Sequence, residues 1–290
     1  MGGGIWTAAS FSTYSESVGR TVSADGYLDS SYTAQDLFKA NRIQKELNPY
    51  NVIRECCDSD EHPCTIPVIL ALDVTGSMGS AAAEVAKKLN KVMTDLYGSV
   101  KDVEFLVMGI GDLAYDRAPI QASQFESDIR IAEQLDKIYF EAGGGGNSYE
   151  SYTAAWYFGI RHTKLDCWNR GKKGIIITMG DEPLNPYLPK VQLENATGDK
   201  LQADVETCDL YCEAIRQFDI YHLAVDDRDT SYKYHATEVN RSWSKYLDKD
   251  HFKVVSLDNI SSTIVDIVKS ASGNKDVVQN QSEENYGISW

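Results

Sequence analysis

The sequence predicts an α/β protein with a mainly parallel central sheet that is covered by helices on both faces. Short apolar runs of strand length recur from residue 66 onward, and amphipathic stretches of helical length separate them. Some runs, such as GIIIT at 174–178, are apolar throughout. Continuous apolar strands are typical of parallel strands buried on both faces. Strands that alternate with helices favour a doubly wound sheet.

Strands and helices are expected to alternate along residues 66–270. The expected strands cover 66–72, 103–110, 174–178, 220–225 and 252–257. The expected helices cover 80–96, 127–139, 149–162, 203–218, 235–247 and 260–270. In the first of these helices Val85, Leu89 and Val92 recur at helical spacing, which predicts one buried face.

The chain divides into three parts by composition. Residues 1–63 form an N-terminal arm followed by a helix expected over 34–47, which stops before Asn48-Pro49. The first part of the arm is rich in Ser, Gly and Tyr, shows no sustained period, and is expected to be extended. Residues 64–272 form the α/β domain, and 273–290 form a polar C-terminal tail. The arm and the tail leave self-association open.

The charge of the chain narrows its partners. Its 290 residues include 28 Lys and Arg against 43 Asp and Glu, which gives a net charge of −15. This acidity disfavours nucleic acid, whose phosphates need a basic surface, and anionic membranes. The N-terminal sequence lacks the basic and apolar regions of a secretory signal, and the apolar runs are too short to span a bilayer. We therefore expect a cytoplasmic protein that binds neither nucleic acid nor membrane.

Oxygen-bearing side chains follow the first predicted strand. Asp73, Thr75 and Ser77 alternate in one turn that leads into the next helix, and Gly76 relieves the backbone between them. In an open α/β sheet, ligands bind outside the carboxyl ends of the strands. Carboxylate and hydroxyl oxygens are hard ligands, which Mg²⁺ and Mn²⁺ prefer.

Two further loops offer oxygen ligands at the same edge of the sheet. A run of four glycines at 143–146 permits a close approach of the backbone, and Asn147 or Ser148 then supplies a neutral oxygen. Asp181 and Glu182 follow the apolar strand 174–178. Three loops that deliver oxygen ligands to one edge predict a cation site there.

The order and spacing of these loops resemble the von Willebrand factor A (VWA) family and its metal-ion-dependent adhesion site (MIDAS). That site uses a D-x-S-x-S loop, a Thr-containing glycine loop and a later Asp. The matching segments here are D-V-T-G-S at 73–77, G-G-G-G-N at 143–147 and G-D-E-P at 180–183. The resemblance covers residues 64–272 and implies a doubly wound, Rossmann-like sheet.

The resemblance also implies one divalent cation, Mg²⁺ or else Mn²⁺ or Ca²⁺. Asp73, Thr75 and Ser77 would hold it. Asp181 would coordinate through water, and Asn147, or alternatively Ser148, would take the position of the family's Thr. Further loop residues are expected around these ligands: Gly76, Gly145, Gly146, Ser148, Glu150 and Glu182.

The mechanism that the resemblance implies is binding without turnover. An open coordination position on the cation would accept an Asp or Glu carboxylate of a partner protein. A bound cation also reverses the local sign of an acidic surface. We therefore expect a non-enzymatic adaptor in a larger complex, such as an AAA-type ATPase assembly.

A second interpretation is a Mg²⁺-dependent phosphatase-like enzyme of the haloacid dehalogenase type. The segment 73–77 also resembles the D-x-T-G-T loop of that family's ATPase branch, in which Asp73 would be the nucleophile. The helix expected over 80–96 leaves no room for the flap of that branch, and the glycine run has no role in it. A binding module is therefore the favoured interpretation.

Overall fold

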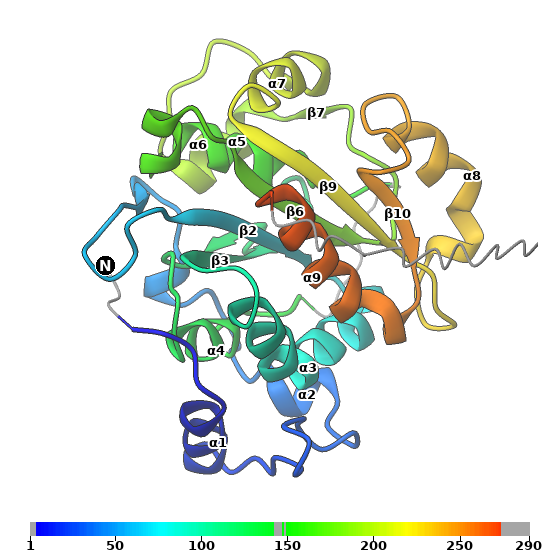
Figure 1. Ribbon diagram of the computed structural model, residues 1–290. Helices are drawn as coiled ribbons and strands as arrows, with labels where there is room; N and C mark the ends of the chain where they lie inside the picture. The colour runs from blue at the N-terminus through cyan, green and yellow to red at the C-terminus, as the bar shows by residue number, and fades with distance from the viewer. Residues whose placement is uncertain (1–3, 142–146, 148, 274–290) are drawn as a thin grey trace, which may run out of the picture.

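A six-stranded sheet forms the centre of the protein (Figure 1). The structure is a computed structural model that describes residues 4–141, 147 and 149–273. The strand order is β10-β9-β6-β2-β3-β4; β4 runs antiparallel to β3, and the other neighbouring pairs are parallel. The strands have the following bounds: β2 Ile66–Asp73, β3 Val103–Ile110, β4 Ile120–Ala122, β6 Gly174–Gly180, β9 Phe218–Val225 and β10 Phe252–Val255. The predicted, mainly parallel sheet is confirmed.

The strand order of the sheet reverses between β2 and β6. Numbered by their order along the chain within this sheet, the strands from β4 to β10 read 3-2-1-4-5-6, which is the order of doubly wound, Rossmann-like sheets. The register pairs Val68 with Ile175 and Leu72 with Met179 across the reversal. Ligands in such sheets bind outside the carboxyl ends of the strands at this point.

Alternate side chains of the central strands enter two separate cores. Val68 and Leu70 of β2 pack on one face, and Ile69 and Ala71 pack on the other. The first face is covered by α3 (Gly79–Tyr97), α4 (Arg130–Leu135) and α9 (Ile260–Ala271). The second is covered by α5 (Thr153–Arg161), α6 (Lys190–Thr197), α7 (Thr207–Ala214) and α8 (Tyr232–Trp243). None of the described helices is long and apolar enough to cross a bilayer.

The first part of the N-terminal arm is helical, which corrects the expectation of an extended segment. Helix α1 covers Ala8–Ser17, and the hydroxyl of Thr7 accepts a hydrogen bond from the Ser10 amide (3.1 Å) at its start. Such a cap satisfies a backbone donor that the first turn leaves open. Helix α1 buries only Phe11 and Ser15, so it has no continuous apolar face. The sequence therefore shows no apolar period over this helix.

The helix expected over 34–47 is also corrected. Helix α2 covers only Ala34–Leu37, a β-bridge joins Ala40 to Tyr139, and a 3₁₀ helix, η1, covers Lys45–Leu47. The Arg20 guanidinium donates a hydrogen bond to the Leu37 carbonyl (2.8 Å), which a longer helix would use internally. Tertiary contacts therefore take up the backbone groups that would have continued the helix.

The arm and the α/β domain share one core. Trp6 and Phe11 lie in the same apolar cluster as α3, and the Trp6 indole donates a hydrogen bond to Asn90 Oδ1 (3.0 Å). The remaining short elements are the paired strands β1 (Arg54–Cys56) and β5 (Thr163–Leu165), the pair β7 (Tyr187–Leu188) and β8 (Val205–Glu206), and the 3₁₀ helices η2 (Gly76–Met78), η3 (Asp166–Arg170) and η4 (Leu257–Asn259).

Candidate metal centre

Three loops meet at the carboxyl edge of the sheet, where the strand order reverses. Asp73 is the last residue of β2, and the chain then turns through η2 into α3. Asp181 comes directly after β6. A β-bridge between Glu150 and Leu184 places the loop before α5 beside the loop after β6. The structure therefore brings the residues after β2, the residues after β6 and Glu150 to one edge of the sheet.

The carboxylate of Asp73 is held from two sides and is only 1% exposed. Its Oδ1 accepts hydrogen bonds from the Thr75 amide (2.9 Å) and the Thr75 hydroxyl (2.5 Å). Its Oδ2 accepts one from the Tyr152 hydroxyl (2.7 Å). These contacts orient a buried carboxylate that would otherwise be costly to place there.

Asp181 is fully buried and only partly satisfied. Its Oδ2 accepts a hydrogen bond from the Ser231 amide (2.5 Å), whereas its Oδ1 has no hydrogen-bond partner among the described residues. Burial raises the pKa of Asp181, and hydrogen bonds from the Ser231 amide and the Ser77 hydroxyl oppose that rise. Asp181 therefore offers a free carboxylate oxygen next to Ser77.

Gly180 permits the contact between Tyr152 and this edge. A Cβ atom at Gly180 would lie 2.1 Å from the Tyr152 hydroxyl oxygen. The same hydroxyl accepts a hydrogen bond from the Glu182 amide (3.3 Å) while it donates to Asp73. Glycine at the end of β6 is thus a requirement of close packing at the site.

The two carboxylates at the reversal point disfavour each other's charge. Burial raises the pKa of Asp73, and the negative charge of Asp181 raises it further. The hydrogen bonds from Thr75 and Tyr152 oppose this rise. A divalent cation between such groups would favour their ionised forms.

Glu150 adds a third buried carboxyl to this edge. It is 6% exposed, and its Oε2 has no hydrogen-bond partner among the described residues. Burial raises the pKa of Glu150 to about 10, and the charge of Asp73 is the next largest cause. Glu182 is less buried, yet its Oε2 is also unpartnered within the described part of the chain.

The second predicted loop contributes less than the first and third. Asn147 hydrogen-bonds Asp112, and its Oδ1 is buried without a hydrogen-bond partner among the described residues. Gly145, Gly146 and Ser148 lie outside the described residues. The choice between Asn147 and Ser148 as the ligand from this loop stays a prediction.

Asp112 is the residue of this edge that the sequence analysis missed. It follows β3, which neighbours β2, so it lies at the same carboxyl edge as Asp73. Ligands in such sheets bind after the carboxyl ends of the strands, so the loop after the expected strand 103–110 is as strong a candidate as the loops after β2 and β6, and Asp112 could have been predicted from it. Asp116 lies in the same loop, and its Oδ2 accepts a hydrogen bond from the Asp112 amide (2.7 Å).

The residues at the reversal point fit an oxygen-binding divalent cation. Carboxylates come from Asp73 and Asp181, and hydroxyls come from Thr75 and Ser77. The Asp181 Oδ1 has no hydrogen-bond partner among the described residues, so it is available to a cation. Within residues 4–141, 147 and 149–273, no three His, Cys, Asp or Glu side chains form a metal-binding group. The fit therefore depends on the hydroxyls as well as on the two carboxylates.

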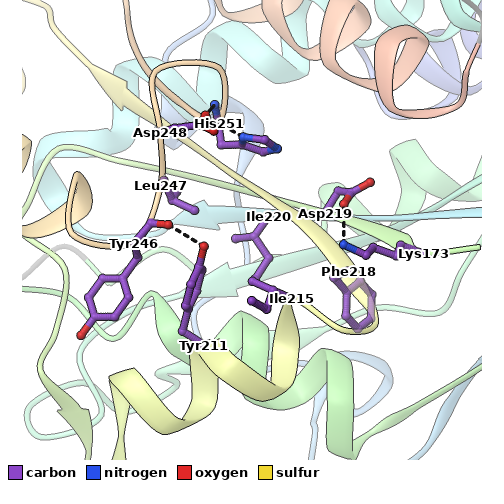
Figure 2. Close-up of a pocket in the computed structure, with 10 residues that line it drawn as sticks. All are labelled: Lys173, Tyr211, Ile215, Phe218, Asp219, Ile220, Tyr246, Leu247, Asp248 and His251. Atoms are coloured by element: carbon purple, nitrogen blue, oxygen red, sulfur yellow. Dashed lines mark hydrogen bonds and ion pairs between the residues drawn. The ribbon is translucent and has the colours of Figure 1, made fainter.

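A cavity of about 280 Å³ lies at the opposite, amino edge of the sheet (Figure 2). It opens where β6, β9 and β10 begin. Its charged side chains are paired: Lys173 contacts Asp219 (3.1 Å), and Asp248 contacts His251 (2.8 Å). The Tyr211 hydroxyl donates to the carbonyl of Tyr246 (2.5 Å).

The strand order and the site at its reversal define a doubly wound α/β protein of the Rossmann-like type. No family model matches the chain, and no curated protein matches its sequence. Solved structures resemble its fold at low identity. They include the pilus adhesin SpaC from Lactobacillus rhamnosus GG in its open conformation, with 12% identity, 78% of this chain and 31% of that chain covered, and a TM-score of 0.47. This chain thus spans less than a third of the length of SpaC.

Two further solved structures, one of them a single domain, are similar in the same way. The vWF domain of the type V pili tip protein Mfa5 from Porphyromonas gingivalis matches with 11% identity, 73% of this chain and 97% of that chain covered, and a TM-score of 0.43. The conserved hypothetical protein BatB from Bacteroides thetaiotaomicron matches with 14% identity, 72% and 99% covered, and a TM-score of 0.43. The fold assignment itself rests on the strand order.

Proposed function

We propose that this chain is a VWA-type binding module that captures an acidic side chain of a partner protein through a bound divalent cation. One observation carries the proposal. At the reversal of the strand order, the buried Asp181 Oδ1 has no hydrogen-bond partner among the described residues, and the Asp181 carboxylate lies close to Ser77 and Asp73. A cation held there would satisfy this oxygen and relieve the repulsion between the two carboxylates.

The surrounding residues position the ligands. The Tyr152 hydroxyl and the Thr75 amide fix the orientation of Asp73, and the Ser231 amide fixes Asp181. When bound, the cation would supply a positive charge with an open coordination position for a partner's carboxylate. Binding by this route needs no covalent step. An adaptor role, an AAA-type ATPase partner and a cytoplasmic location stay predictions from the sequence.

Selection from a random peptide library tests the proposal, because it requires only the chemistry of the partner and not its identity. The wild-type chain in Mg²⁺ should enrich peptides that contain Asp or Glu. Enrichment should disappear in EDTA and in Asp73→Ala, and it should persist in Asp219→Ala, which removes a paired carboxylate at the amino edge. Acidic peptides that bind equally well in EDTA and to Asp73→Ala would overturn the proposal.

The phosphatase-like alternative has its own test. Incubation with phosphate esters and Mg²⁺ should release no phosphate and leave no hydroxylamine-labile phosphate on the chain. Turnover that depends on Asp73 would replace the binding module with an enzyme.

A further inference from the structure

Asp112 carries an unsatisfied carboxylate oxygen at the carboxyl edge, one strand away from the site at Asp73. Its side chain is 2% exposed. Its Oδ1 accepts a hydrogen bond from the Ala114 amide (2.8 Å), and the Asn147 side chain also hydrogen-bonds this carboxylate. Its Oδ2 nevertheless has no hydrogen-bond partner among the described residues. A buried carboxylate oxygen without a donor or a cation is costly, so this one calls for a partner.

Backbone contacts hold Glu150 beside Asp112. The Ser151 amide donates to the Gly111 carbonyl (3.3 Å), and the Leu113 amide donates to the Ser151 hydroxyl (3.0 Å). These two bonds join residues on either side of Asp112 to the residue that follows Glu150. The two acidic residues therefore belong to one small, buried junction between the loop after β3 and the loop before α5.

This junction holds several unpartnered oxygens and no basic side chain in an ion pair. Asp112 Oδ2, Asn147 Oδ1 and Glu150 Oε2 are all buried without a hydrogen-bond partner among the described residues. None of the ion pairs formed by the described residues includes Asp112 or Glu150. Two carboxylates and one amide, all with oxygen atoms available, match the ligands of a hard divalent cation.

We infer that Asp112, Asn147 and Glu150 hold a second divalent cation beside the one proposed at Asp73. Mixed carboxylate and amide ligands from irregular loops suit Ca²⁺, which accepts flexible geometry, better than Mg²⁺, which demands an octahedron. Ca²⁺ is therefore the probe of choice. The second site differs from the site of the proposed function in its carboxylates, Asp112 and Glu150. Its third ligand, Asn147, is one of the two alternatives expected at the first cation, and this inference assigns it to the second.

Calorimetric titration of the full chain with Ca²⁺, after removal of metals with EDTA, tests the inference. The wild type should bind two Ca²⁺ per chain. Asp112→Asn should bind one Ca²⁺, because the first site remains. Adding Asp73→Ala to this variant should then abolish the remaining binding. Glu150→Gln serves as the second variant if Asp112→Asn does not fold, and far-UV circular dichroism checks both. Asp219→Asn, at the amino edge, is the matched control and should still bind two.

The outcomes separate the two sites. Two Ca²⁺ bound by Asp112→Asn, or one Ca²⁺ bound by the wild type and lost only in Asp73→Ala, would overturn the second site. One Ca²⁺ bound by the wild type, lost in Asp112→Asn and unaffected by Asp73→Ala, would support the second site and count against the proposed function. If Glu150 and Asp112 are protonated and hold no cation, neither Asp112→Asn nor Glu150→Gln should bind less Ca²⁺ than the wild type. This result would also overturn the inference.

Discussion

The two edges of the same sheet differ in how their acidic side chains are buried and paired. At the amino edge, the acidic side chains that line the cavity are partly or largely exposed, and each has a partner: Asp219 forms an ion pair with Lys173, and Asp248, whose side chain is 67% exposed, hydrogen-bonds His251 (Figure 2). At the carboxyl edge, Asp181 and Asp112 each keep a buried oxygen without a partner among the described residues. The acidic groups of the amino edge are thus paired and partly in solvent, whereas Asp181 and Asp112 of the carboxyl edge are buried with oxygens that lack a partner in the described part of the chain.

This difference favours the carboxyl edge as the site of the proposed binding function. Buried carboxylates that stabilise a fold are normally paired, because removing an unpaired charge from water costs on the order of several kcal/mol. A group of such carboxylates at the topological reversal point, where α/β sheets bind ligands, favours a binding role.

The largest effect is expected for Asp73→Ala. Loss of an outer partner of a metal ligand typically weakens binding by about 10–100-fold, and loss of a direct ligand should weaken it more. Mn²⁺ titration should show this loss at the carboxyl edge, whereas Asp219→Ala at the amino edge should bind as the wild type does. In EDTA the variant should be at least as stable to heat as the wild type, because the repulsion between Asp73 and Asp181 is removed. Equal Mn²⁺ affinity in both variants would show that the edges do not differ.

Two glycines at opposite ends of β6 offer a matched pair. A Cβ at Gly180 would lie 2.1 Å from the Tyr152 hydroxyl oxygen, and a Cβ at Gly174 would lie 2.7 Å from the Phe218 ring. Overpacking should destabilise both alanine variants by about 1–3 kcal/mol, measured by urea unfolding. Only Gly180→Ala should also weaken cation binding, because it displaces the tyrosine that orients Asp73. Weakened binding in Gly174→Ala would break the contrast.

The stability of the metal-free protein should fall as the pH rises. Burial raises the pKa of Asp73 to about 7 and that of Asp116 to about 6, from 3.8 in both cases. The folded state therefore binds more protons than the unfolded state between about pH 4 and these values, and stability is lost as the pH increases through that window. The melting temperature in EDTA should be lower at about pH 8 than at about pH 5.5, and Mg²⁺ should restore it.

Glu150→Gln sharpens the pH test. The pKa of Glu150 is raised to about 10 in the folded state. This carboxyl therefore lowers the stability of the fold progressively as the pH rises through the neutral range, and Gln removes that dependence. In EDTA the variant should gain stability over the wild type, and the gain should grow from about pH 5.5 to about pH 8. A constant difference between the two proteins at all pH values would contradict a role of this carboxyl in the pH dependence.

The smallest effect is expected at the amino edge. Lys173→Ala breaks a half-exposed ion pair with Asp219, and such pairs contribute about 0.2–1 kcal/mol. Cation binding should not change. A large loss of stability, measured by urea unfolding, would mean that the paired charges at this edge matter more than their exposure suggests.

The strands were predictable because burial on both faces makes them apolar without interruption. Five predicted strands agree with the structure to within two residues at each end. The short edge strand β4 was not predicted, since its three residues, Ile120–Ala122, are too few to form a pattern.

Helix ends were less predictable because tertiary bonds compete for them. The helix expected over 127–139 is restricted to α4 (Arg130–Leu135). At its start, Asp128 accepts a hydrogen bond from the Arg130 amide (3.0 Å). At its end, the Tyr139 amide donates to the side chain of Gln121 (2.9 Å), a residue of β4.

The sequence by itself determined the sheet and placed Asp73 and Asp181 at its carboxyl edge. It could do so because parallel strands end at one edge, so a residue that follows a buried strand has a known position. Only the tertiary structure decided which loop residues meet there. Glu150 approaches Asp112 through backbone bonds between segments far apart in the chain, and Gly180 makes room for Tyr152. Such contacts depend on the packing of loops, which leaves no periodic trace in the sequence.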